Sequence, residues 1–136
     1  MVRLEDHFEC REYFYICLEL HSKLTLFDYI NKYTTQIEEI RAQELAKKIG
    51  MAIEYLHDNG IILRNLESTG ILMTETDDMV EKSIPRISRF NKAEIIGYDC
   101  HVHSIVGDIR FRAPEVLLGK HYDFKADSWS FGVILF

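Results

Sequence analysis

Residues 55–70 read YLHDNGIILRNLESTG, and this run decides the fold. Asn59-Gly60 ends a helical pattern, because glycine readily adopts the left-handed conformation that closes a helix. Ile61-Ile62-Leu63 follows at once and predicts a short buried strand. The run therefore predicts a long helix, a tight turn, a strand and then a polar loop.

An apolar stripe predicts the long helix that leads into this run. Between Glu38 and His57, apolar residues recur at spacings of four, four and three, at Leu45, Ile49, Ile53 and Leu56. Leu24–Tyr33 also has helical spacing, with Asp28 near its start, and predicts a shorter helix. Tyr13–Leu20 is rich in aromatic and β-branched residues and predicts a buried strand.

Downstream of the run, two short strands are predicted at Gly70–Met73 and Arg86–Ser88. The acidic segment Thr74–Ser83 between them is predicted to be solvated surface. Asn91–Arg112 has little periodicity, which predicts an extended or irregular segment. Ala113-Pro114-Glu115 then opens a turn of helix, because proline is favoured at a first helical position.

Composition favours one globular unit. The chain has 136 residues, 47% of them hydrophobic, which suffices for one core and is short for two ordinary domains. Sixteen Lys and Arg oppose 22 Asp and Glu, and the basic residues are scattered, so we expect no nucleic-acid partner. The longest apolar stretch is far below the roughly 20 residues of a membrane span, so we expect no membrane association.

The cysteines suggest a reducing, cytoplasmic location. Cys10, Cys17 and Cys100 are odd in number and lack the spacing of a disulfide framework or a zinc ribbon. His101 and His103 lie next to Cys100 in the sequence and leave a metal site as one alternative. The other interpretation of this segment is a polar loop.

Several motifs follow one another in a fixed order: Y-L-H-x-N-G-I-I at 55–62, L-R-N-L at 63–66, I-S-R-F at 87–90, A-P-E at 113–115 and D-x-W-S-x-G at 127–132. Together they resemble the eukaryotic protein kinase family, from just before the hinge to the central helix of the larger lobe. The resemblance implies an α+β fold with the end of the small lobe and the hinge strand in residues 1–20. Residues 21–136 would form part of a mostly helical large lobe. The apolar helix predicted at 126–136 has no terminal cap, so we expect a partial domain.

The resemblance assigns four site positions to residues that cannot perform the family's chemistry. Asn65 stands at the catalytic aspartate and has no basic carboxylate. Gly70 stands at a magnesium-binding asparagine, and Arg89 at the metal-binding aspartate of D-F-G. Glu67 reverses the charge of the usual lysine. The resemblance therefore implies no metal site and no ordinary phosphate transfer.

Other positions keep the packing part of the family pattern. Leu63 and Phe90 are expected to stack on each other, and Asp127 to accept hydrogen bonds from the catalytic-loop backbone. Trp129 is expected to pack beneath the activation segment. Glu115 is expected to be exposed or to have a new partner, because its usual arginine is absent from the sequence.

Two further expectations concern phosphate and nucleotide. Arg64 keeps the position that receives an activation-loop phosphate in the family, and a phosphorylated Ser104 could reach it. Arg89 could contact ATP phosphates without magnesium, or instead pair with Glu or Asp in a collapsed cleft. If adenine binds, the resemblance places it against the hinge and the strand beneath it, at Leu18, Glu19, His21 and Leu72.

Three functions are consistent with these features. The first is a catalytically inactive module that binds or scaffolds another protein, with a kinase as one candidate partner. The second is a divergent Ser/Thr kinase that uses other carboxylates such as Glu67 or Asp99. The third is a fragment without independent function.

Overall fold

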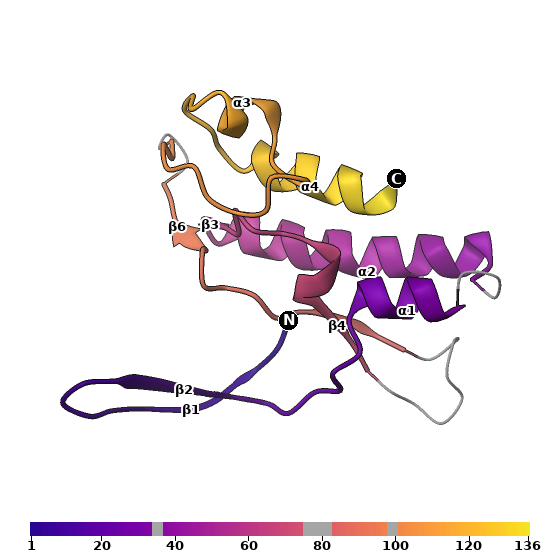
Figure 1. Ribbon diagram of the computed structural model, residues 1–136, viewed down its shortest axis with the longest axis horizontal. Coiled ribbons are helices and arrows are strands. Elements are labelled where there is room, and N and C mark those ends of the chain that lie inside the picture. Colours follow the sequence, from indigo (N-terminus) through magenta and orange to yellow (C-terminus); the bar gives the residue numbers. More distant parts are fainter. Residues whose placement is uncertain (34–36, 75–82, 98–100) are drawn as a thin grey trace.

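Helix α2 (Glu39–Asp58) is the longest of the described elements, and further helices lie on either side of it (Figure 1). The computed structural model describes residues 1–33, 37–74, 83–97 and 101–136. The remaining elements are β1 (Leu4–Glu9), β2 (Phe14–Leu18), α1 (Leu26–Tyr33), β3 (Ile61–Ile62), the 3-10 turn η1 (Ser68–Gly70), β4 (Ile71–Met73), β5 (Pro85–Ile87), β6 (Glu94–Ile95), α3 (Pro114–Leu117) and α4 (Lys125–Leu135).

The strands form three small antiparallel sheets, which pair β1 with β2, β3 with β6 and β4 with β5. In the second sheet Ile61 pairs with Ile95, and in the third Ile71 pairs with Ile87. The third sheet packs against α1 and α2. Small sheets beside long helices make the α+β class, as the sequence predicts.

The main core lies where α1 and α2 meet the sheet formed by β4 and β5. All four residues of the predicted stripe are buried, at Leu45, Ile49, Ile53 and Leu56. Tyr29, Ile71 and Met73 are fully buried in the same cluster. Truncating one such aliphatic side chain to alanine costs roughly 2 to 5 kcal/mol, so this cluster fixes the loop that follows β3.

A second cluster connects the end of the chain to the loop. It contains Ile62 of β3, Val116 of α3 and Ala126 of α4, together with Ile96, Val102, Ala113 and Tyr122. Val102 and Tyr122 exchange two backbone hydrogen bonds, of 2.9 and 3.0 Å. This bridge holds the irregular segment after β6 against the turn before α4.

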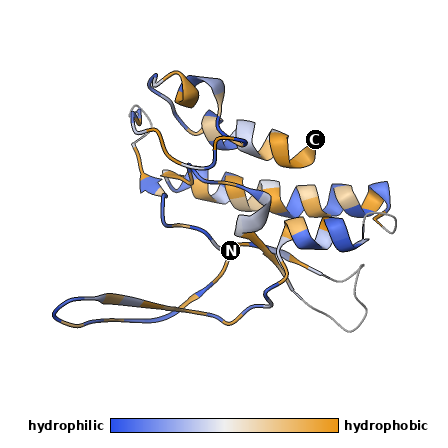
Figure 2. Ribbon diagram, viewed as in Figure 1, coloured by the Kyte–Doolittle hydropathy of each residue, from blue (hydrophilic) through white to orange (hydrophobic). Residues whose placement is uncertain are grey.

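The prediction of a buried strand at Tyr13–Leu20 is wrong in one respect. A strand forms at Phe14–Leu18, but all five of its residues are exposed. Among the described residues its strand partner is β1, and the resulting hairpin stands away from the helices (Figure 1). Hydrophobic residues recur along this hairpin. They also occupy the second half of α4 (Figure 2). The apolar pattern predicted the strand correctly, but no described element packs over its faces.

The other predicted elements agree with the structure to within a few residues. The irregular segment 91–112 contains the short strand β6 and one bridge, which the sequence did not indicate. Most of the acidic segment Thr74–Ser83 lies outside the described residues. Its last residue, Ser83, is buried, contrary to the prediction of solvated surface, because Arg41 donates a hydrogen bond to its carbonyl. No described helix is long and apolar enough to cross a membrane.

Candidate functional site

An ion pair joins the loop after β3 to the segment after β5. The guanidinium of Arg89 donates to Oε1 of Glu67. The Glu67 side chain is only 7% exposed, whereas that of Arg89 is 47% exposed. Burial of an unpaired carboxylate would be unfavourable, so Arg89 is the group that allows Glu67 to lie inside.

Gly70 provides the space that this ion pair needs. A Cβ built on Gly70 would lie 3.2 Å from Cδ and 3.4 Å from Cγ of Arg89. The backbone carbonyl of Gly70 accepts hydrogen bonds from the Ser88 backbone N–H, at 3.0 Å, and from the Ser88 hydroxyl, at 2.9 Å. The stem of Arg89 therefore lies directly on the Gly70 backbone.

These residues do not fit a magnesium ion. Gly70 has no side-chain oxygen, and Arg89 places a cation where a hard divalent ion requires a carboxylate. The remaining carboxylate, Glu67, is already paired with that cation. Across the described parts of the chain, no group of three or more His, Cys, Asp or Glu residues is arranged to hold a metal.

Asn65 holds the loop to a second segment. Its Oδ1 accepts a hydrogen bond of 3.1 Å from the backbone N–H of Asp108. Gly107 beside it has a φ of 87°, and a Cβ there would lie 2.4 Å from the Arg64 carbonyl oxygen. The two backbones approach so closely that only glycine fits at position 107.

The Arg64 side chain makes three contacts with the irregular segment 91–112. It has a φ of 62°, and its Nε donates to the Lys92 carbonyl at 2.6 Å. Its Nη1 lies 2.6 Å from Oγ of Ser104 and 2.7 Å from Oε2 of Glu94. The contact with Ser104 is therefore present without a phosphate. Glu94 was not predicted as a partner of Arg64. An acidic residue in the irregular segment that was expected to face Arg64 was a signal that could have identified it.

Asp127 organises the start of the loop from α4. It is completely buried and accepts hydrogen bonds from the backbone N–H groups of Leu63, at 2.7 Å, and Arg64, at 2.8 Å. The Asp127 oxygen that accepts from Leu63 is Oδ2. Nε2 of His57 lies 3.0 Å from the same oxygen. His57 also packs on Phe124, with ring centroids 4.9 Å apart. No role of His57 was predicted from the sequence, although the Y-L-H motif contains it.

The four other positions of the family's packing pattern differ in their burial. Leu63 is buried in the main core, and Phe90 packs against the same cluster. Trp129, expected to pack beneath the activation segment, is 49% exposed. Glu115 is half-buried, and no ion pair to its side chain is found within the described residues.

The residues expected near adenine lie along the hairpin and β4. Leu18 is 47% exposed, and Leu72 is half-buried in β4. Oε1 of Glu19 accepts from the Arg3 backbone at 2.6 Å and lies 3.2 Å from Nε2 of His21. His21, and then the Arg3 N–H, lower the pKa of the Glu19 carboxyl below its ordinary value. The acidic side chain thus joins the start of the chain to the segment that follows β2.

His101, His103 and His121 have neighbouring rings, but no metal site is found among the residues that the structure describes. The rings of His103 and His121 lie 4.6 Å apart between centroids, and those of His101 and His121 lie 6.4 Å apart. Cys100, the third member of the predicted alternative, lies outside the described residues.

Comparison with known proteins gives consistent matches over the whole sequence. The family model of the protein kinase domain matches residues 1–136. Myosin light chain kinase A of Dictyostelium discoideum is 32% identical over the complete chain, which covers 45% of that relative. A probable myosin light chain kinase of the same organism is also 32% identical, with 34% of its length covered. A cGMP-dependent protein kinase of Toxoplasma gondii is 31% identical, with 13% covered. The chain thus spans less than half the length of each of these relatives.

Proposed function

Because this chain belongs to the protein kinase domain family, we propose that it is an inactive member in which an internal ion pair replaces the phosphate-transfer centre, and that it acts by binding another protein. The observation that carries this proposal is the contact of Arg89 with Glu67 across Gly70. All three residues occupy positions where the family resemblance implies groups that handle phosphate and metal.

The loss of a catalytic base supports inactivity. Asn65 cannot accept a proton at neutral pH as a carboxylate can, and its Oδ1 already accepts from Asp108. A positioned base contributes roughly 10²- to 10⁴-fold in rate. Its replacement alone would therefore suppress turnover strongly.

The ion pair supports the absence of a nucleotide cofactor. For Arg89 to bind ATP phosphates without magnesium, it would have to leave Glu67 unpaired in a largely buried position. The collapsed-cleft alternative for Arg89 is thus the better supported one, and we assign no cofactor to the chain.

A protein partner is favoured by the apolar surface of the hairpin. Its large exposed side chains are Leu4, Phe8, Phe14, Tyr15, Ile16 and Leu18. Large exposed apolar side chains gathered on one hairpin favour a contact with another protein. We propose another protein as the partner, and a protein kinase is the first candidate to test. The free, exposed thiols of Cys10 and Cys17 favour a reducing, cytoplasmic setting.

The second candidate is a divergent Ser/Thr kinase, which the names of the relatives favour. It would need another catalytic carboxylate, such as Glu67 or Asp99. Glu67 is already engaged by Arg89, and Asp99 lies outside the described residues. Inactivity and scaffolding therefore remain the proposal that the geometry supports better.

A thermal-shift titration with ATP, with and without magnesium, separates these functions, because a ligand that binds only the folded state raises its melting temperature. The proposal predicts no shift in either series and no transfer of phosphate to a Ser/Thr peptide. A magnesium-dependent rise accompanied by transfer would instead establish the divergent kinase. A rise without magnesium would show that Arg89 leaves Glu67 to bind phosphate, and would overturn the assignment of no cofactor.

A further inference from the structure

Three aromatic rings form a row on one face of the hairpin of β1 and β2. Phe8 pairs with Tyr15 across the two strands, and their rings are stacked, with centroids 4.8 Å apart and planes 17° apart. The centroid of the Tyr13 ring lies 6.2 Å from that of Tyr15. Residues that lie opposite each other, or two apart along a strand, share one face of a sheet. Phe8, Tyr15 and Tyr13 therefore form an aromatic ladder.

The aromatic ladder is open to solvent. Its three residues are between 43% and 61% exposed, and the hairpin stands away from the helices (Figure 1). Aromatic side chains bring a large apolar area to a contact at a low cost in conformational entropy, because they have few rotatable bonds. The ladder is therefore a surface suited to a partner.

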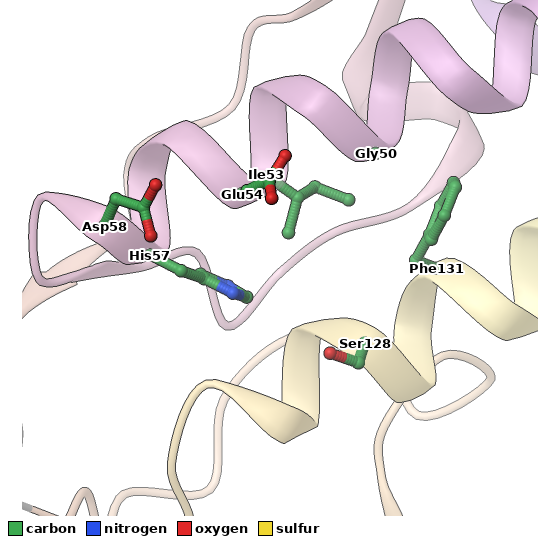
Figure 3. A pocket seen from close by; sticks show the side chains of 7 residues that line it. All are labelled: Gly50, Ile53, Glu54, His57, Asp58, Ser128 and Phe131. Atoms are coloured by element: carbon green, nitrogen blue, oxygen red, sulfur yellow. The ribbon is translucent and has the colours of Figure 1, made fainter.

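The cavity between α2 and α4 differs in this respect (Figure 3). Its Ile53 is buried in the main core, and its His57 is hydrogen-bonded to Asp127. The Phe131 ring stands against Gly50, where an added Cβ would lie 3.6 Å from Cε1 of the ring. These side chains serve the packing of the two helices, whereas the rings of the aromatic ladder face solvent.

The hairpin around the aromatic ladder is acidic. Residues 1–20 contain five Asp and Glu but two arginines. Asp6, two positions before Phe8, lies on the face of the ladder. Glu9 and Glu12 lie beside the turn, and neither has an ion-pair partner among the residues that the structure describes. The charge favours a cationic ligand and opposes single-stranded nucleic acid, whose bases also stack on rings but whose phosphates need a basic groove.

We propose that the aromatic ladder binds a proline-rich, basic segment of a partner protein in the polyproline II conformation. Such segments dock on surfaces lined by aromatic side chains, and their preformed helix loses little entropy on binding. Polyproline II has no internal hydrogen bonds, so its carbonyls are free to accept from the hydroxyl of Tyr13. Lysine or arginine in the segment would lie near Glu9 and Glu12. The binding of such a segment rests on the protein-binding function proposed above, for which it specifies the partner.

An NMR titration of the full chain with an octapeptide that has six prolines between two terminal arginines tests the proposal. We expect saturable shifts centred on Phe8, Tyr13 and Tyr15. An octapeptide with glycine and serine in place of the prolines should give no saturable shift at these residues over the same concentrations. An octapeptide with glutamate in place of the arginines should bind at least about fivefold more weakly, because repulsion replaces attraction.

Single variants on the two faces of the hairpin provide the controls. Tyr15→Thr removes the middle ring, keeps a residue suited to a strand, and should weaken binding at least about tenfold. Tyr15→Phe retains the ring and should weaken binding by about threefold or less. His7→Thr removes a ring from the other face, where His7 pairs with Ile16, and should leave the titration unchanged. Both positions are exposed, so thermal melts should show the fold retained in all three variants.

The absence of a saturable shift, equal binding of the glycine and serine peptide, or unchanged binding by Tyr15→Thr would each overturn the proposal. Equal binding of the peptide with glutamate ends would overturn the assignment to a basic partner. The titration is independent of phosphate transfer, so the two proposals can fail separately. Transfer by a chain that binds the peptide would refute inactivity alone, and failure to bind in a chain without transfer would refute the proline-rich partner alone.

Discussion

The stem of Arg89 lies across Gly70, so closely that a Cβ on Gly70 would come within 3.2 Å of its Cδ. Gly70→Asn, which would restore the family residue, would therefore press on the Arg89 stem beside its contact with Glu67 and require it to shift. We expect the substitution to lower the free energy of unfolding by about 1 to 3 kcal/mol, as overpacking usually does. Urea denaturation measures this effect. In an Arg89→Ala background the same substitution should cost much less, and an equal cost there would contradict the packing argument.

The ion pair itself can be tested by charge exchange. Arg89→Asp would place two carboxylates together beside the core, and we expect it to lower stability by about 2 kcal/mol. Glu67→Lys combined with Arg89→Asp reverses the pair and should recover most of that loss. A double-mutant cycle followed by thermal unfolding gives the coupling directly. No recovery in the double variant would show that the two side chains act independently.

Asp127 should be the most sensitive polar position in the loop network. Asp127→Ala would leave the backbone N–H groups of Leu63 and Arg64 buried without an acceptor, so we expect a loss of about 3 kcal/mol or more. Ser128→Ala, at the exposed adjacent position, should change stability by less than about 0.5 kcal/mol. Chemical denaturation of the two variants compares them. Similar losses in both would refute the role of Asp127.

Asp108 gives a prediction for acid pH. The guanidinium of Arg110 lowers the pKa of its carboxyl from 3.8 to about 2. A carboxyl whose pKa is lower in the folded state stabilises the fold above its unfolded pKa and loses that contribution as pH falls from 3.8 toward 2. Arg110→Gln should raise the pKa of Asp108 toward 3.8, measured by NMR titration of the carboxyl carbon. An unchanged pKa would show that the backbone N–H of Arg110 is sufficient.

Phosphorylation of Ser104 would add charge where Arg64 already contacts the hydroxyl. We expect a semisynthetic phosphoserine at this position to displace Glu94 from Arg64 and to raise the melting temperature by about 3 °C, which corresponds to about 1 kcal/mol. The comparison chain carries Arg64→Gln, in which the phosphate should give no increase. A similar increase in both chains would mean that Arg64 is not the receiving group.

Local sequence patterns predicted most of the helices and strands, but not what covers them. The stripe from Leu45 to Leu56 specifies its own burial, because four apolar residues on one face of a helix need a common neighbour. The strand at Phe14–Leu18 has the composition of a buried strand, yet its burial depends on residues outside the strand. Periodicity contains no information about those residues.

The candidate site shows the same division. The kinase-like spacing indicated Asn65, Glu67, Gly70 and Arg89 together, and the pairing of Arg89 with an acidic residue was one of two alternatives. The contact of Asn65 with Asp108 crosses 43 positions, and that of His57 with Asp127 crosses 70. Such partners are chosen by the path of the chain in space, and residue type alone does not identify them.

The geometry at positions 67, 70 and 89 also constrains the history of the sequence. An ancestor with the family's lysine at 67 would have held two cations together as soon as arginine appeared at 89. An ancestral asparagine at 70 would have occupied the space that the arginine stem now fills. A change at 67 alone or at 89 alone would each bring like charges together, so the residues at these two positions depend on each other. Reversal of Arg89 alone would then leave a chain adapted to a residue it no longer has.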